Sequence, residues 1–148
     1  HATAPGIGDP DGFKLDDCAT QRNLSDAGRA EARRLGDAFR ANGITSARVL
    51  SSQWCRCLET ARLMDLGPVE PIGLLNSFFS ERGRETMQTA ALKAALGAMS
   101  LAKPVVLVTH QVVMTALVGG GAASAETVVV RRDQNGLLSV VGTIPPPQ

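Results

Sequence analysis

The sequence contains no tyrosine, and its one tryptophan and four phenylalanines bring aromatic residues to only 3 %. So few aromatic rings argue against a surface on which nucleic-acid bases stack. The net charge is +1, because 15 lysines and arginines face 14 acidic residues, so no broad basic surface for nucleic acid or membrane is expected. No apolar run is long enough to span a bilayer. We therefore expect neither a nucleic-acid partner nor a transmembrane segment.

Cysteine is also scarce, and its odd number limits what it can form. With Cys18, Cys55 and Cys57 in the chain, at most one internal disulfide is possible and one thiol stays free. We favour the pair Cys18–Cys55, because this bond would tie a loop to the start of a helix; three reduced cysteines are the alternative. Cys55 and Cys57 lack the C-x-x-C spacing of redox and zinc motifs, so a zinc site that combines the cysteines with a histidine has little support.

The residues that are plentiful indicate one folded domain. The chain has 148 residues, of which 44 % are apolar and 20 % charged, a balance typical of a soluble globular domain spanning residues 1–148. Residues 6–12 are rich in Gly, Pro and Asp, which indicates a loop. A loop this elaborate normally follows a strand, so we expect the first strand of the domain to lie upstream of His1.

Helical and strand patterns alternate along the rest of the chain. Ser25 is a good helix N-cap, and the apolar repeat after it predicts a helix that Asn42 and Gly43 end. Strands are expected over 47–51, 69–72, 104–109, 127–130 and 137–141. A second helix is expected to follow strand 47–51 and to end at about residue 66, and two more are expected over 85–99 and over 112–118. The last two strands flank a turn, so they predict a hairpin. This order predicts an α/β domain with a mostly parallel sheet and an antiparallel end.

Polar side chains follow the predicted parallel strands, where sites form in open α/β sheets. Arg56 comes after strand 47–51, in the first turn of a helix whose free N–H groups already favour an anion. His110 follows strand 104–109, and His1 would follow the upstream strand. No other histidine occurs in the chain. We therefore expect two imidazoles and one guanidinium to meet around one tetrahedral oxyanion.

Four short segments, taken together, resemble the motifs of a known family. His1-Ala-Thr3 is similar to the end of Arg-His-Gly-x-Thr, and Arg22-Asn-Leu-Ser25 with Gly28 is similar to Arg-Pro-Leu-Thr-x-x-Gly. Residues 51–61 are similar to Ser-Ser-x-x-x-Arg-x-x-x-Thr-Ala, and Val108-Thr-His110-Gln is similar to Val-Ser-His-Gly. These motifs belong, in this order, to the histidine phosphatase superfamily, which includes the cofactor-dependent phosphoglycerate mutases. The resemblance implies a three-layer, phosphoglycerate-mutase-like domain with helices on both faces of the central sheet.

The resemblance also implies a mechanism and assigns roles to individual residues. His1 would attack phosphorus and become a phosphohistidine, which water then hydrolyses. Arg56, His110 and Arg22 would hold the phosphate oxygens. Glu81 is the nearest candidate for the proton donor, because the stretch in which the family often carries one reads Leu75-Asn-Ser77, and Asp16 and Asp17 are further candidates. The mechanism needs no metal and no cofactor.

Two departures from the family pattern bear on activity. The arginine that the family places immediately before the nucleophile is absent from this sequence, which begins at His1. Ala2 stands where the family has glycine, a change that we treat as tolerable. Without a strong proton donor, substrates with good leaving groups or phosphoramidates would be favoured.

The sequence thus predicts a phosphomonoester or phosphoramidate hydrolase that acts on a small phosphorylated substrate, with a catalytically weak phosphoanion-binding module of the same fold as the alternative. A cysteine-dependent phosphatase is excluded, because four residues separate Cys57 from Arg62 and six separate Cys55 from it, where five are required. Cys18 and the Cys-Arg-Cys stretch resemble extracytoplasmic bacterial members of the family. We therefore expect a periplasmic or otherwise extracytoplasmic location, with the cytoplasm as the alternative.

Overall fold

The computed structural model describes all 148 residues, with four α-helices and five strands. The helices are α1 (Asp26–Ala41), α2 (Cys55–Met64), α3 (Glu85–Ala98) and α4 (Gln111–Val118). The strands are β1 (Arg48–Ser51), β2 (Val69–Pro71), β3 (Val105–Val108), β4 (Thr127–Arg132) and β5 (Leu138–Ile144). Short 3₁₀ turns lie at Cys18–Thr20, Gly73–Leu75 and Arg82–Arg84. Each predicted helix and strand is present, and the predicted fold class is confirmed.

The central sheet is parallel, with β1 between β2 and β3. Ser51, the last residue of β1, pairs with Pro71 on one side and with Val108 on the other. The carboxyl ends of β1 and β3 therefore lie at the same edge of the sheet, which is where the residues that follow them meet. The C-terminal strands β4 and β5 form a separate antiparallel hairpin with an irregularity between Val129 and Val130.

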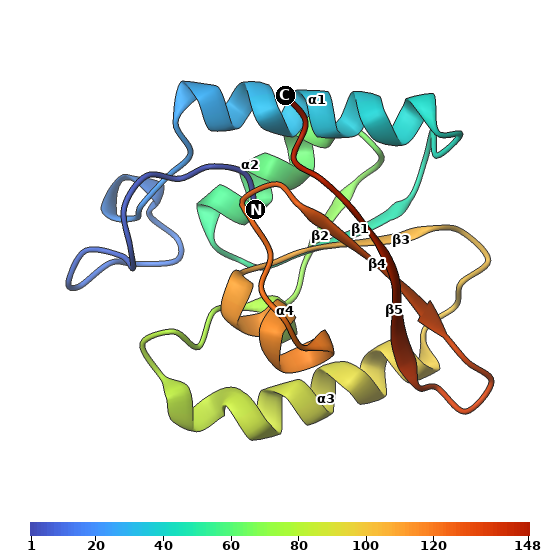
Figure 1. Ribbon diagram of the computed structural model, residues 1–148. Helices are drawn as coiled ribbons and strands as arrows, with labels where there is room; N and C mark the ends of the chain where they lie inside the picture. Colours follow the sequence, from blue (N-terminus) through green and yellow to red (C-terminus); the bar gives the residue numbers. More distant parts are fainter.

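Helices cover both faces of this sheet, which gives three layers (Figure 1). Successive strand residues point to opposite faces. Accordingly, Val49 packs into an apolar cluster with α1 and α2, and Leu50 packs into a second cluster with α3 and α4. Figure 1 shows α1 and α2 on one side of the strands and α3 and α4 on the other.

Helix α1 has the N-cap and the buried apolar stripe that its sequence predicts. The Ser25 hydroxyl accepts a hydrogen bond from the N–H of Gly28, so Ser25 caps the helix as expected. The buried side chains include Ala32, Leu35 and Phe39, which lie on one stripe. These residues pack the helix against α2 and close the first of the two apolar clusters.

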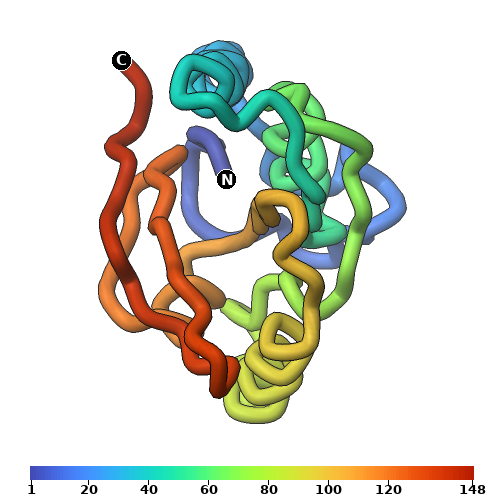
Figure 2. Tube along the Cα trace, turned by 90° about the vertical axis from the view of Figure 1, so that its right-hand side faces the viewer, coloured from blue at the N-terminus to red at the C-terminus, as the bar shows by residue number.

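The hairpin lies along one side of the molecule, away from β2 (Figure 2). An apolar groove of about 310 Å³ is lined by Val105–Val108 of β3, by Thr127–Val130 of the hairpin and by His1. The strand expected upstream of His1 concerns residues outside the chain and stays a prediction. None of the helices combines the length and the hydropathy that a membrane crossing requires.

Candidate functional site

The segment that carries His1 is held in place by α1 and α2. The N–H of Ala2 donates to the Thr60 hydroxyl on α2 at 3.1 Å, and the carbonyl of Thr3 accepts from the N–H of Ser25 at 3.2 Å. Gly28 lies directly against this segment, because a Cβ there would come within 2.1 Å of the Thr3 carbonyl oxygen. Residues of three of the family-like motifs thus contact one another and fix the backbone beside His1.

Arg56 and His110 reach the same place from two neighbouring strands. Arg56 is the second residue of α2, which follows β1, and His110 lies between β3 and α4. Both side chains are buried, and the His110 ring centroid lies 5.4 Å from that of His1. Arg56 Nε donates to His1 Nε2 at 3.3 Å, and its Nη2 lies 3.5 Å from His110 Nδ1. The three side chains therefore share one site, while their catalytic roles stay predictions.

Hydrogen bonding assigns the tautomers of both rings. His1 Nδ1 lies 2.8 Å from the carbonyl oxygen of Ala2, which can only accept, so Nδ1 carries the proton and Nε2 keeps its lone pair. Arg56 can only donate, so His110 Nδ1 is an acceptor and its Nε2 donates to Ser52 Oγ at 2.8 Å. Burial, followed by the charge of Arg56, holds the pKa of His110 well below its usual value of 6.5. His110 is therefore neutral at physiological pH.

Ser52 and Asn76 support His110 from behind. The Ser52 hydroxyl accepts from His110 and from the N–H of Trp54, and it donates to Asn76 Oδ1 at 3.3 Å. From the sequence, Ser52 was noted only as part of a motif and Asn76 was given no role. Ser52 directly follows β1, which was a usable signal, whereas Asn76 follows the 3₁₀ turn at Gly73–Leu75 and not a strand. The free thiol of Cys57 also lies 3.5 Å from His110 Nε2, and burial raises its pKa. The thiol is therefore neutral at physiological pH and no thiolate competes with His1.

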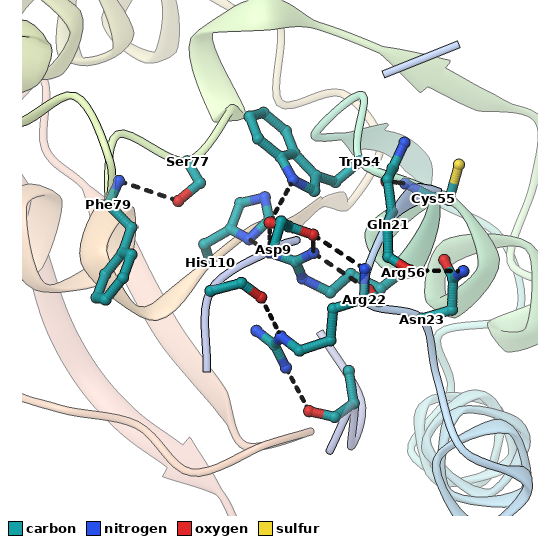
Figure 3. A network of polar contacts seen from close by, with 12 residues as sticks. Asp9, Gln21, Arg22, Asn23, Trp54, Cys55, Arg56, Ser77, Phe79 and His110 are labelled. Carbon is teal, nitrogen blue, oxygen red and sulfur yellow. Dashed lines mark hydrogen bonds and ion pairs between the residues drawn. The ribbon is translucent and has the colours of Figure 1, made fainter. Parts of the chain in front are cut away.

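Asp9 is the main residue that the sequence analysis missed. Its carboxylate forms an ion pair with Arg56, with Nη1 2.8 Å from Oδ1 and Nη2 3.2 Å from Oδ2. The side chains of Arg56 and Asp9 are only 3 % and 8 % exposed. Figure 3 shows Asp9 between Trp54, Arg56 and Arg22. Nothing in the loop composition marks this carboxylate as buried, because loops rich in Gly, Pro and Asp are usually solvated.

Arg22 and Glu81, two predicted site residues, line the cleft without joining the cluster of His1, Arg56 and His110. The Arg22 guanidinium donates from Nε to the carbonyl of Gly8 at 2.6 Å and from Nη1 to the carbonyl of Ala4, so it braces the loop in this structure. Glu81 is 67 % exposed, and its carboxylate lies 3.4 Å from Arg84. The further donor candidates Asp16 and Asp17 are exposed, and Asp17 caps the turn at Cys18–Thr20.

Two members of this cluster, His1 and His110, line a cleft of about 320 Å³, whereas Arg56 is not one of its lining residues. His1, His110, Asp9 and Arg22 contribute to its polar lining. Its other lining residues include Ile7, Phe13, Trp54, Ser77, Phe79, Glu81 and Glu126. A tetrahedral anion together with a small leaving group therefore fits beside the two imidazoles.

The predicted disulfide is present. Cys18 and Cys55 are bonded, with their Cα atoms 5.7 Å apart, and Cys57 is the free cysteine. The bond joins the loop to the first residue of α2, immediately before Arg56. Because two of the three cysteines are used in this bond, they are not available as zinc ligands, and no group of three or more His, Cys, Asp or Glu residues is arranged to hold a metal ion.

Comparison with known proteins agrees with the family suggested by the motifs. Residues 18–78 match the sequence model of the histidine phosphatase superfamily (branch 1). A search of curated proteins gives no significant match. The chain therefore resembles the histidine phosphatase superfamily in sequence over residues 18–78, as its motifs predicted.

Solved structures resemble the chain over 80–99 % of its length. The protein histidine phosphatase SixA complexed with tungstate has a TM-score of 0.70 at 17 % identity, covering 99 % of this chain and 92 % of that chain. YhfR of Bacillus stearothermophilus has a TM-score of 0.62 at 18 % identity, covering 80 % and 82 %. A phosphoserine phosphatase mutant of Entamoeba histolytica in complex with phosphoserine has 0.63 at 13 %, covering 82 % and 83 %. The fold is thus that of phosphoglycerate-mutase-like phosphatases.

Proposed function

We propose that the protein hydrolyses phosphomonoesters or phosphoramidates through a phosphohistidine on His1. The observation that carries the proposal is the meeting of His1 Nε2 and Arg56 Nε, 3.3 Å apart, beside the ring of His110. The proton on Nδ1 leaves Nε2 unprotonated, with a lone pair that accepts from Arg56 Nε in this structure and is the electron pair that a nucleophile needs. The matching sequence model and the fold of phosphatases support the same reaction class.

The reaction has two steps. In the first, His1 Nε2 forms a bond to phosphorus while the bond from phosphorus to the leaving oxygen or nitrogen breaks, and the leaving group keeps that electron pair. In the second, water attacks the phosphohistidine, releases inorganic phosphate and restores the neutral imidazole after losing a proton. Arg56 would neutralise charge on the phosphoryl oxygens in both steps, and His110 and Arg22 are proposed as further oxygen ligands.

The proton donor limits which substrates this site suits. Glu81, the proposed donor, is 67 % exposed and pairs with Arg84, so it is not held toward the leaving group. A weakly placed acid favours leaving groups that depart without a proton, or phosphoramidates, whose nitrogen is basic enough to be protonated by solvent. The fold shared with a protein histidine phosphatase supports the phosphoramidate option.

A comparison of three substrates and one variant tests the proposal. The wild-type protein should hydrolyse p-nitrophenyl phosphate and phosphoimidazole much faster than an alkyl phosphate such as glycerol phosphate. The His1→Ala variant should lose about a thousandfold or more of kcat, and acid-labile phosphate should be trapped on His1 during turnover. Equal residual rates in wild type and His1→Ala, with phosphate still bound, would instead support the phosphoanion-binding module.

The Cys18–Cys55 disulfide supports the proposed extracytoplasmic location, because such bonds persist in oxidising compartments. Cell fractionation under alkylating conditions tests it directly. The oxidised protein should be recovered in the periplasmic or secreted fraction, and recovery of the reduced protein in the cytoplasm would favour the alternative.

A further inference from the structure

Every N–H donor of Arg56 has an acceptor inside the protein. A guanidinium carries five N–H groups and no acceptor. Nε donates to His1 Nε2, Nη1 donates to Asp9 Oδ1 and to the carbonyl of Arg22, and Nη2 faces both Asp9 Oδ2 and His110 Nδ1. A phosphate that binds Arg56 must therefore take over some of these N–H groups, and the geometry determines which ones.

The contacts divide between the two edges of the guanidinium. The end-on edge, formed by Nη1 and Nη2, holds both carboxylate oxygens of Asp9 in a bidentate pair at 2.8 and 3.2 Å. The side-on edge, formed by Nε and Nη2, faces His1 and His110 at the longer distances of 3.3 and 3.5 Å. Hydrogen bonds between charged groups are stronger than those to a neutral ring nitrogen. Phosphate oxygens would therefore replace the histidine contacts and leave the ion pair in place.

Asp9 is itself held from several sides. Besides the two bonds from Arg56, its carboxylate accepts from Trp54 Nε1 at 3.0 Å and from the N–H of Arg22 at 3.1 Å (Figure 3). Burial by itself would raise the pKa of Asp9, but the hydrogen bonds from Arg56 and from the backbone of Arg22 lower it below its usual value. The carboxylate is thus ionised at neutral pH and fixed in one orientation.

We propose that Asp9 is a positioning residue, which holds the end-on edge of Arg56 and so keeps the side-on edge turned toward the space between His1 and His110. The inference rests on the proposed function and adds a residue that acts through Arg56 rather than on the substrate. Asp9 also offsets the charge of Arg56 when no phosphate is bound, so the arginine is ordered in advance and need not be immobilised by the substrate.

Asp9→Asn is the variant that tests this role, with Asp11→Asn as the matched control. The asparagine keeps the shape of the side chain but loses the charge and one acceptor, while Asp11 is an exposed carboxylate in the same loop. The first readout needs no turnover. In ¹⁵N-edited NMR spectra the Arg56 Nε–H signal, assigned with Arg56→Lys, should be protected from exchange in wild type and in Asp11→Asn. It should be lost or exchange at least about tenfold faster in Asp9→Asn; an unchanged signal would overturn the proposal.

Steady-state kinetics with p-nitrophenyl phosphate provide the second readout. Loss of orientation should lower kcat about 10–100-fold, while the inhibition constant of inorganic phosphate changes by less than about threefold, because removing a nearby negative charge offsets weaker alignment. A kcat within about twofold of wild type, or a parallel loss of kcat and phosphate affinity, would contradict a positioning role. If the proposed hydrolase activity itself is wrong, wild type will show no His1-dependent turnover, and the NMR readout will still decide the role of Asp9.

Discussion

The candidate site and the C-terminal hairpin are built from opposite kinds of contact. The site joins residues 1, 9, 52, 56 and 110, which are far apart in sequence and whose charged and polar groups are buried or half-buried and hydrogen-bonded to one another. In the hairpin β4 pairs only with its neighbour β5, and Val140 and Val141 are 46 % and 49 % exposed. The same type of residue should therefore matter very differently in the two regions.

Two arginine substitutions should show the largest contrast. Arg56→Ala leaves the buried Asp9 carboxylate without its partner, which should lower the free energy of unfolding by about 3–5 kcal/mol. Arg131→Ala removes an exposed arginine of β4 and should change it by less than about 0.5 kcal/mol. Urea unfolding measures both values.

The same pair of variants should also differ in ligand binding. Inorganic phosphate, measured by calorimetry, should bind Arg56→Ala at least about tenfold more weakly than wild type, because the variant loses a charged partner. Arg131→Ala should bind it normally. Equal phosphate affinity in the two variants would show that Arg56 does not bind the phosphate.

Removal of the disulfide, which lies next to the candidate site, should lower stability less than Arg56→Ala does. The bond closes a sequence separation of 37 residues, and removing it with Cys18→Ser and Cys55→Ser together should lower stability by about 2–4 kcal/mol. The hairpin has no such link. Peptide mapping under non-reducing conditions should recover a peptide that joins Cys18 to Cys55, and three alkylatable thiols in the native protein would rule out the bond.

The pH dependence of stability should be the smallest of these differences. Burial, followed by the charge of Arg56, lowers the pKa of His110 in the folded protein. As the pH falls, His110 is therefore protonated in the unfolded chain before it is protonated in the folded protein. The contribution of His110 is therefore full above about pH 6.5 and falls as the pH drops below it, with a slope of at most about 1.4 kcal/mol per pH unit for one proton. Urea unfolding between pH 7.5 and 5 should show this slope, and His110→Asn should reduce it. A slope that persists in the variant would place the titration elsewhere.

Local patterns were sufficient to predict the secondary structure. The cap at Ser25 and the spacing of Ala32, Leu35 and Phe39 predicted α1. The mostly β-branched residues at 104–109 predicted β3. These signals depend on neighbours within a few residues, so they can be read directly from the chain. The separation of the hairpin into its own sheet was not predicted, because strand pairing depends on which edges the rest of the fold leaves open.

The candidate site was predictable in part. His1, Arg56 and His110 were expected to meet, because parallel strands bring their carboxyl ends to one edge, and the structure places them together. Arg22 was expected to bind the anion; it lines the cleft, its guanidinium donates to the carbonyls of Gly8 and Ala4 in this structure, and its role toward an anion stays a prediction. Its direction is set by the path of the loop, on which the sequence pattern carries no information.

The sequence by itself determined the order of helices and strands, the two imidazoles and the guanidinium at strand ends, and the cysteine positions. Only the tertiary structure decided that Asp9 pairs with Arg56, that Ser52 supports His110, and that Glu81 stays in solvent. The reason is that burial and long-range hydrogen bonds depend on how distant segments pack, whereas helix and strand formation depends mainly on neighbouring residues.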